Sequence, residues 1–246
     1  MKTISILLVD DHALLRQGLR ALLQTVPEFA VIGEAENGRQ AVQLVDKLKP
    51  DIVVMDIAMP QLNGLEATVQ ICKISPRSKV LIVSSYSDDV YVQKLTEAGA
   101  VGYLIKQAAA NELIKAIHET YKGNAYFSPA IAKRLLDRYR ESFLTGGKAP
   151  TRQTIPRLTS REREVLQLVA EGRSNKQMGS DLCISIKTIE KHRQQVMNKL
   201  GIHEVAGLTR YALSQGLTES MPQALGDHPE IDAGNRIDGA ETPASP

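Results

Sequence analysis

The chain has 246 residues, of which 43% are hydrophobic and 24% are charged, as in soluble globular proteins with room for two domains. Its apolar runs are far too short to span a bilayer, and its first residues do not form a signal-peptide pattern. Cys72 and Cys183 have neither metal-ligand spacing nor the pairing of a disulfide framework. These features favour a cytoplasmic protein without a membrane partner.

The formal net charge of +2 is unevenly distributed along the chain. Basic and acidic residues number 13 and 14 in residues 1–125, 7 and 2 in 126–157, 9 and 6 in 158–217, and 1 and 6 in 218–246. A basic second half suggests an anionic partner, although basic faces are often only solvated surface.

Strand and helix patterns alternate through the first half of the chain. Five such units with nearly continuous apolar strands predict a doubly wound five-stranded parallel sheet covered on both faces, an α/β fold. The expected strands are 4–9, 30–35, 51–56, 79–84 and 102–106, and the expected helices are 13–26, 39–49, 64–74, 89–99 and 110–123.

The second half is predicted to be all helical. A helix pattern at 128–142 and a stretch rich in Gly, Pro and Thr form an expected helical and flexible linker, 123–153. Capping boxes at Thr159 and Ser174 mark the starts of two helices. The tail, 220–246, has no apolar periodicity and is expected to be disordered. The expected helices of this half are 160–171, 175–182, 186–199 and 204–215.

Polar side chains follow four of the predicted strands at the point where each strand ends. Asp10 and Asp11 follow the first strand, Asp56 the third, Ser84 the fourth and Lys106 the fifth. Each alone fits a turn or a solvated side chain, but carboxyl ends of parallel strands share one edge, where ligands bind. Three crowded carboxylates require a positive neighbour, and their oxygens suit Mg²⁺. One carboxylate could then attack a phosphoryl group, with the lysine and the serine donating to its oxygens.

The segments "LLVDDH", "VVMDIAMPQLNG", "LIVSS" and "GYLIK" resemble the receiver domain of bacterial two-component response regulators. The resemblance assigns residues 3–122 to this flavodoxin-like domain. It implies that Asp56 is the phosphoacceptor, with Lys106 beside it, and that a sensor histidine kinase supplies the phosphoryl group.

The same resemblance implies a metal site and a switch. Mg²⁺ would be held by Asp11, Asp56 and the backbone carbonyl of Ala58, with Asp10 assisting through water. Ser84 and Tyr103 would form the switch pair, in which the hydroxyl moves toward the phosphate while the aromatic ring turns inward.

The segment "SDLCISIKTIEKHRQQVMNKL" has the outline of a helix-turn-helix. Ile189, Val196 and Leu200 recur at helical spacing and are expected to face inward, which leaves a basic and polar face outward. An ordinary amphipathic helix in a four-helix bundle would show the same pattern.

The longer segment from "LTSREREVL" to "MNKLGI" resembles the LuxR-type DNA-binding domain, here 154–219, and a receiver joined to it is the NarL/FixJ arrangement. This implies binding to paired half-sites in double-stranded DNA, homodimerisation on activation and, as a further candidate partner, RNA polymerase. The positions implied to face bases are Glu190, Lys191 and Gln194. The candidates for phosphate contact are Ser174, Asn175, Lys176, Lys187, Thr188, His192, Arg193 and Lys199.

Two other functions fit the same residues. The chain could be a hydrolase with an aspartyl-phosphate nucleophile, but such enzymes commonly have an acid two positions after the nucleophile, where this chain has Ala58. Alternatively, the receiver could be an interaction module that is never phosphorylated. We predict a transcription regulator that is not an enzyme.

Overall fold

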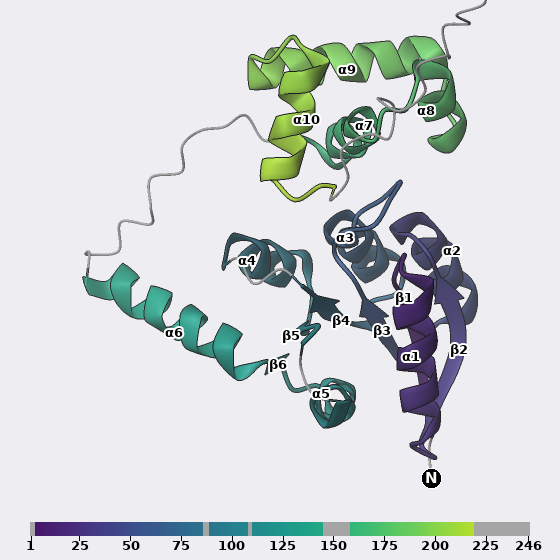
Figure 1. The fold of residues 1–246 in the computed structure, drawn as a ribbon, viewed down its shortest axis with the longest axis vertical. Coiled ribbons are helices and arrows are strands. Elements are labelled where there is room, and N and C mark those ends of the chain that lie inside the picture. The colour runs from purple at the N-terminus through teal and green to yellow at the C-terminus, as the bar shows by residue number, and fades with distance from the viewer. Residues whose placement is uncertain (1–2, 86–88, 108–109, 145–157, 219–246) are drawn as a thin grey trace, which may run out of the picture.

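The structure is a computed structural model, and it describes residues 3–85, 89–107, 110–144 and 158–218. The predicted tail, 220–246, lies outside this range, as does the Gly- and Pro-rich part of the predicted linker. An α/β unit is followed along the chain by the helix α6 and then by a helical unit (Figure 1). Within the described residues, no helix has both the length and the apolar character needed to cross a bilayer.

The first unit is built on a parallel sheet with the strand order β2-β1-β3-β4-β5-β6. Its first five strands have the order of flavodoxin-like doubly wound sheets, which confirms the predicted fold class. Adjacent strands end together, since Val9 pairs with Met55 and Met55 with Ile82. The first five strands are β1 (Ile4–Val9), β2 (Phe29–Ala35), β3 (Ile52–Met55), β4 (Lys79–Ser84) and β5 (Gly102–Ile105).

The predicted strand count of five is one too low. The extra strand, β6 (Tyr126–Phe127), pairs in parallel with Gly102 and Tyr103 of β5. Two residues are too few to produce a periodic pattern, so the sequence carried no signal for this strand. The backbone N–H of Ser128 then donates to the carbonyl of Tyr103 at 3.0 Å, and α6 (Pro129–Leu144) begins at the next residue.

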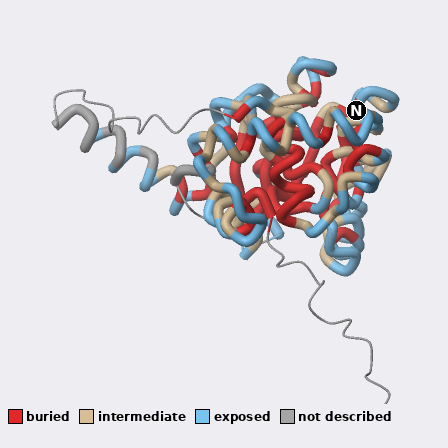
Figure 2. Tube along the Cα trace, turned by 90° about the horizontal axis from the view of Figure 1, so that it is seen from above, coloured by how far each residue is buried: buried red, intermediate tan, exposed pale blue. Residues whose placement is uncertain are grey.

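Helices cover both faces of the sheet, with α1 and α5 on one face and α2, α3 and α4 on the other (Figure 1). Leu8 lies in one apolar cluster with Leu23 of α1 and Ile117 of α5. Its neighbour Leu7 points to the opposite face, where it shares a cluster with Ile71 of α3. Most residues of the strands are buried, and in Figure 2 the buried residues lie at the centre of the molecule with exposed residues around them. These helices are α1 (Ala13–Gln24), α2 (Gly38–Leu48), α3 (Gly64–Ile74), α4 (Asp89–Ala98) and α5 (Ala110–Lys122).

The second unit has four helices around a separate apolar core. The predicted capping boxes at Thr159 and Ser174 are both present, and Ser185 caps the third helix as expected. Ile189 and Val196 are buried in the core, as the helical spacing predicted. The four helices are α7 (Ser160–Ala170), α8 (Asn175–Asp181), α9 (Ile186–Leu200) and α10 (Val205–Ser214).

Candidate functional site

Acidic side chains converge at the carboxyl edge of the sheet. One ligand atom from each of Asp10, Asp11, His12 and Asp56 lies within 4.8 Å of all the others. Asp10 and Asp56 are each 3% exposed, whereas Asp11 and His12 lie on the exposed rim. The structure therefore brings together the three aspartates that follow β1 and β3 in the sequence.

A single lysine bridges the two buried carboxylates. Lys106, which follows β5, donates from Nζ to Asp56 Oδ2 at 2.7 Å and lies 2.9 Å from Asp10 Oδ2. Its backbone N–H donates to the carbonyl of Ser84 at 2.8 Å, so the ends of β4 and β5 are fixed against each other. The side chain of Ser84 is fully buried at this edge.

The remaining bonds of Asp56 fix its carboxylate. Its backbone N–H donates to the carbonyl of Val9 at 2.9 Å, which continues the ladder between β1 and β3. Its Oδ1 accepts a hydrogen bond from the backbone N–H of Ile57 at 2.7 Å. Since Lys106 holds Oδ2, both carboxylate oxygens have a partner.

Burial changes the acid–base behaviour of this pair. Burial raises the pKa of Asp56 from 3.8 to about 6, although the hydrogen bond and charge of Lys106 act in the opposite direction. Burial lowers the pKa of Lys106, but its hydrogen bonds and ion pairs with Asp56 and Asp10 outweigh burial, and the net shift is upward. The ionised form of Asp56 is thus costly here, and a further cation beside it would stabilise that form.

This shift predicts a pH-dependent gain in stability for Asp56→Asn. Because the pKa of Asp56 is raised by folding, its ionisation costs native stability as the pH rises through about 6. We expect the variant to exceed wild type at pH 8 by up to about 3 kcal/mol, and the gain to shrink toward pH 4. Urea unfolding in the presence of a chelator measures this difference. A gain that is constant between pH 5 and pH 8 would contradict the prediction.

The donor set at this edge fits a hard divalent cation. Three carboxylates face one lysine, so the site carries surplus negative charge, and carboxylate and carbonyl oxygens are the ligands of such ions. Asp10, Asp11 and Asp56 are therefore the side chains that could hold Mg²⁺. Ala58, two residues after Asp56, is 3% exposed, and the use of its backbone carbonyl as a ligand stays an expectation from the sequence resemblance.

Arg16 supports this edge and was not predicted to do so. It is 8% exposed and donates from Nη1 to the carbonyl of Asp10 at 2.6 Å, and from Nε to Glu34 at 3.1 Å. These bonds fix the loop that carries Asp10 and Asp11. In the sequence, an arginine in the first turns of an amphipathic helix looks like an ordinary solvated cation, so its role could not be inferred.

The two predicted switch residues are both inside the protein. Ser84 is fully buried and Tyr103 is 1% exposed, in an apolar cluster with Leu95 of α4 and Ile131 of α6. The ring of Tyr103 is covered by the helices around it, and its role in a switch stays a prediction. Through Ile131, this cluster also includes the helix that follows the first unit.

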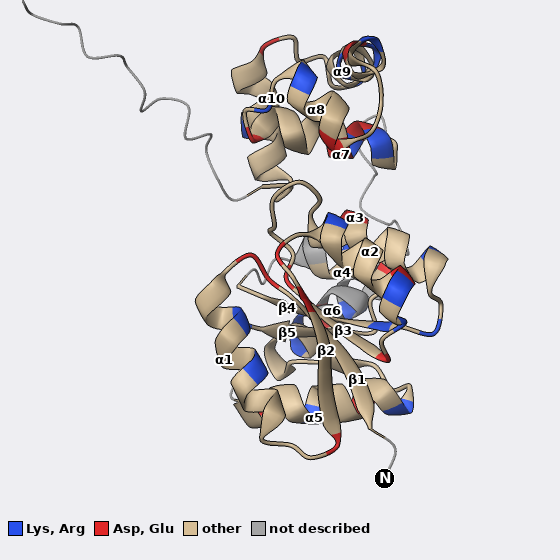
Figure 3. Ribbon diagram, turned by 90° about the vertical axis from the view of Figure 1, so that its right-hand side faces the viewer, with Lys and Arg blue, Asp and Glu red and all other residues tan. Residues whose placement is uncertain are grey.

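The second unit presents a basic and polar surface on α9. Of the predicted base-facing residues, Glu190, Lys191 and Gln194 are all exposed, as is Lys187 at the start of the helix. Figure 3 shows Lys and Arg on α9, at the end of the molecule farthest from the sheet. The arrangement of α8, the turn and α9 matches the helix-turn-helix outline of the sequence.

Several predicted phosphate contacts are already engaged within this unit. Arg193 donates to Asn175 Oδ1 at 2.5 Å, and Lys199 donates to the 3% exposed Glu162 at 2.7 Å. A contact of either side chain with phosphate would compete with these bonds. Of the other candidates, Ser174 and Lys176 are exposed, and Thr188 and His192 are partly exposed.

Comparison with known families gives two matches along the chain. Residues 6–118 match the family described as "Response regulator receiver domain", and residues 156–212 match "Bacterial regulatory proteins, luxR family". The first range contains the acidic edge, and the second contains the exposed face of α9.

Curated proteins similar to the chain are transcriptional regulators. The chain is 39% identical over 210 residues to the transcriptional regulatory protein DegU of Brevibacillus brevis, which covers 82% of this chain and 89% of that one. It is 39% identical over 209 residues to the transcriptional regulatory protein LiaR of Bacillus subtilis, covering 85% and 96% of the two chains. The response regulator VraR of Staphylococcus aureus is 32% identical, with 88% and 100% covered.

The chain is also similar to solved structures of response regulators. A two-component response regulator of the LuxR family from Aurantimonas sp. matches with a TM-score of 0.55 and 36% identity, over 56% of this chain and 99% of that one. The RcsB response regulator of Salmonella typhimurium matches with a TM-score of 0.51 and 25% identity, over 87% of this chain and 100% of that one.

Proposed function

Since the chain belongs to the response regulators that join a receiver domain to a LuxR-type DNA-binding domain, we propose that Asp56 receives the phosphoryl group that controls DNA binding. The observation that carries this proposal is the geometry around Asp56. Its carboxylate stands at the end of β3, 2.7 Å from the ammonium group of Lys106 and among two further aspartates.

The chemistry follows from these groups. A carboxylate oxygen of Asp56 attacks the phosphorus of a phosphohistidine on a sensor histidine kinase, an acyl phosphate forms, and the histidine leaves with the electrons of the broken P–N bond. Lys106 and Ser84 donate to the oxygens of the transferred group. When bound by Asp10, Asp11, Asp56 and the Ala58 carbonyl, Mg²⁺ supplies positive charge against the phosphoryl oxygens.

The phosphoryl group then changes the surface of the first unit. It adds negative charge at a buried site, and the hydroxyl of Ser84 and the ring of Tyr103 are placed to respond to that charge. The cluster around Tyr103 reaches α4 and α6, so the response can extend to the linker. We propose that this response promotes a homodimer that binds paired half-sites, with α10 contributing to the dimer contact. Cytoplasmic location and RNA polymerase as a partner fit this role.

In this function the receiver domain spans residues 3–122, the linker 123–153 and the DNA-binding domain 154–219. The contact of α6 with the Tyr103 cluster indicates that the linker is also connected to the sheet, through Ser128 and Ile131.

Selection of bound fragments from genomic DNA tests this function directly. Full-length protein should enrich fragments that share a pair of half-sites, and acetyl phosphate with Mg²⁺ should increase the enrichment. Asp56→Asn protein should not respond to acetyl phosphate. Enrichment that is equal with and without the phosphodonor would support the alternative, an interaction module that needs no phosphorylation.

Lys191→Ala should weaken and broaden DNA binding. Lys191 is exposed on the outer face of α9, where a lysine can reach a base edge in the major groove. We expect a loss of about 1–3 kcal/mol on the selected sequence and a smaller loss on unrelated DNA. Competition binding measures both values, and Lys122→Ala, which removes an exposed lysine from α5, is the control. Equal losses on all sequences would contradict a base contact.

An enzymatic function as an aspartyl-phosphate hydrolase makes a different prediction. It would give sustained release of phosphate from a phosphate ester, whereas a response regulator takes up one phosphoryl group per molecule and stops. Ala58 provides no general acid at the position where such hydrolases commonly have one.

A further inference from the structure

Each polar group of Asp10 has a partner in the structure. Its backbone N–H donates to the carbonyl of Ala35 at 3.1 Å, and its Oδ1 accepts from the backbone N–H of His12 at 2.9 Å. Its Oδ2 lies 2.9 Å from Nζ of Lys106. The remaining group, the backbone carbonyl, accepts from Nη1 of Arg16 at 2.6 Å in a buried position. Arg16 thus completes the bonding of a residue that is itself 3% exposed.

The carbonyl that Arg16 holds belongs to the peptide group between Asp10 and Asp11. A peptide group is planar, so fixing its oxygen also fixes the direction in which the chain enters Asp11. Asp11 lies on the exposed rim, where packing does little to orient it. The 2.8 Å contact of its Oδ1 with Nδ1 of His12 is within the same loop and does not tie that loop to the sheet. The approach of Asp11 to the other carboxylates consequently depends on the peptide that Arg16 holds.

Arg16 is held in turn by two carboxylates at the end of β2. Its Nε donates to Glu34 Oε2 and its Nη2 donates to Glu36 Oε1, both at 3.1 Å. The planar guanidinium therefore uses donors on all three of its nitrogens, a geometry that the single ammonium group of a lysine does not reproduce. The β1–α1 loop is connected to β2 through this one buried side chain.

Arg20, one turn further along α1, provides a comparison within the same cluster. It donates from Nη1 to Glu34 Oε1 at 2.7 Å, and its side chain is 52% exposed. In the part of the chain that the structure describes, this bond goes to β2 and not to the β1–α1 loop. Arg16 and Arg20 thus share a charge, a helix and one partner, and they differ in their contact with the loop.

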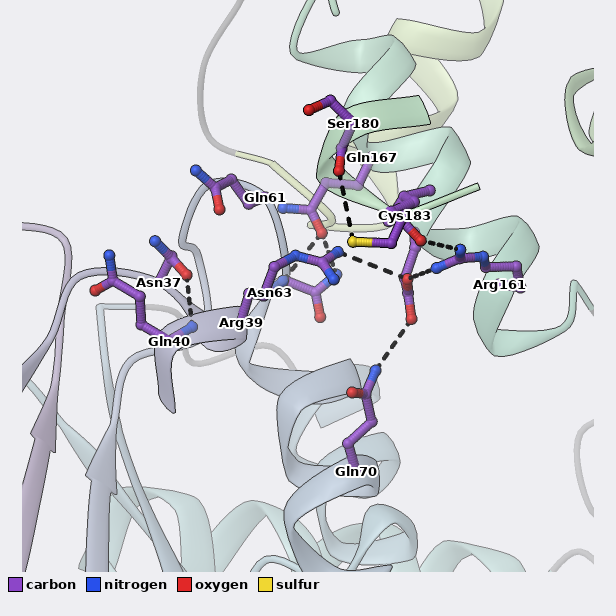
Figure 4. A network of polar contacts seen from close by, with 12 residues as sticks. Asn37, Arg39, Gln40, Gln61, Asn63, Gln70, Arg161, Gln167, Ser180 and Cys183 are labelled. Atoms are coloured by element: carbon purple, nitrogen blue, oxygen red, sulfur yellow. Dashed lines mark hydrogen bonds and ion pairs between the residues drawn. The ribbon is translucent and has the colours of Figure 1, made fainter. Parts of the chain in front are cut away.

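The second unit contacts this edge of the sheet at a different loop. Gln167 of α7 accepts from the backbone N–H of Asn63 at 3.0 Å and donates to the carbonyl of Met59 at 2.8 Å, both in the β3–α3 loop (Figure 4). The bonds of Arg16 described above lie entirely within the first unit. A change at Arg16 can therefore be tested in the full-length chain without removing a contact between the units.

We propose that Arg16 is a positioning residue for the metal site, and that it sets the affinity for a divalent cation by orienting the peptide between Asp10 and Asp11. This inference rests on the proposed function, in which these aspartates hold Mg²⁺. Substituting residues that orient metal ligands from outside the ligand shell commonly lowers metal affinity by about 10- to 100-fold. Charge alone predicts the opposite result, because a cation beside the site repels a second cation and its removal should tighten binding.

Titration of the full-length protein with Mn²⁺ separates these two effects. Mn²⁺ accepts the same oxygen ligands as Mg²⁺, and electron paramagnetic resonance measures the free ion. Arg16→Gln should bind Mn²⁺ about tenfold more weakly than wild type. Arg16→Lys retains the charge but loses the three-nitrogen geometry, so it should also bind more weakly, and it serves if Arg16→Gln folds poorly. Arg20→Gln, the matched control, removes the same charge from the same helix and should bind at least as tightly as wild type.

Three results of this titration would overturn the inference. The first is Mn²⁺ binding by Arg16→Gln that equals or exceeds wild type. The second is wild-type binding by Arg16→Lys, because one ammonium group would then replace the guanidinium. The third is a loss in Arg20→Gln as large as that in Arg16→Gln, since the effect would not depend on contact with the loop. Partial unfolding is distinguished from all three because it lowers the number of sites and leaves their affinity unchanged.

Phosphoryl labelling supplies a second measurement. In Arg16→Gln, the Mg²⁺ concentration that gives half of the maximal rate of labelling from acetyl phosphate should rise about tenfold. The rate in saturating Mg²⁺ should stay near that of wild type, because Asp56 and Lys106 are unchanged. A lower maximal rate at an unchanged half-saturating concentration also overturns the inference, because the defect would then not lie in metal binding.

Asp11→Asn separates this inference from the function on which it rests. If wild type binds Mn²⁺, Asp11→Asn does not bind it and Arg16→Gln equals wild type, the inference fails while the proposed metal site stands. If wild type and Asp11→Asn bind Mn²⁺ alike, the proposed metal site is wrong and the inference falls with it.

Discussion

Full-length protein carrying Asp56→Asn should take up no phosphoryl label from acetyl phosphate, whereas wild type should be labelled in the presence of Mg²⁺. The amide has nearly the shape of the carboxylate and can still accept from Lys106, so the fold of the edge is preserved. It lacks an anionic oxygen that can attack phosphorus, and this loss should be complete. Mass spectrometry of the intact protein measures the label.

Asp51→Asn is the matched control for this experiment. Asp51 precedes the same strand, β3, at its opposite end, where it accepts from the hydroxyl of Ser5 at 2.6 Å. The same chemical change there should leave labelling at the wild-type level. Labelling of Asp56→Asn at the wild-type rate would show that the nucleophile is Asp10 or Asp11 and not Asp56.

The acidic edge was predictable because it follows from strand direction. In a parallel sheet, residues that end successive strands must meet at one edge, so the sequence alone predicts that Asp10, Asp56 and Lys106 lie together. The sequence could not give the 2.7 Å contact between Lys106 and Asp56, or the raised pKa of Asp56, because both depend on burial by the surrounding loops.

The contact between the two units left no recognisable pattern in the sequence. Glu164, Gln167 and Glu171 are spaced as one polar side of α7, and such a side usually faces water. The structure covers it, because the first unit supplies donors such as Gln70 and the backbone of Asn63. Periodicity identifies polar faces but does not distinguish a solvated face from one that is paired with another domain.

The sequence also does not reveal what Gly64 contacts, because an Asn-Gly pair is an ordinary loop signal. The structure gives the glycine a specific role, because the first turn of α3 lies against the peptide of Asp56. Glycine is required at this position because a side chain would not fit, and not because of a positive φ angle. A side chain at this position should therefore affect both the stability of the first unit and phosphoryl transfer to Asp56.

Gly64→Ala should destabilise the first unit. The added Cβ would lie 2.2 Å from the carbonyl oxygen of Asp56 and 2.9 Å from Cα of Ile57, and backbone on both sides must shift to admit it. Overpacking of this kind costs about 1–3 kcal/mol. Gly18→Ala is the control, since nothing lies within 4 Å of its added Cβ in the exposed part of α1, and it should stabilise by about 0.5–1 kcal/mol. Urea unfolding of both variants measures the difference.

The same shift should impair labelling at Asp56. Moving α3 away from β3 changes the position of the Asp56 carboxylate relative to Lys106, and phosphoryl transfer depends on such positioning. Initial rates of labelling from acetyl phosphate should therefore fall in Gly64→Ala and stay at the wild-type level in Gly18→Ala. Measurement at a temperature where circular dichroism shows both variants folded separates this effect from unfolding. A Gly64→Ala protein with wild-type stability and wild-type labelling would show that the loop absorbs a methyl group without cost, and that the close approach of α3 to Asp56 does not set the geometry of the site.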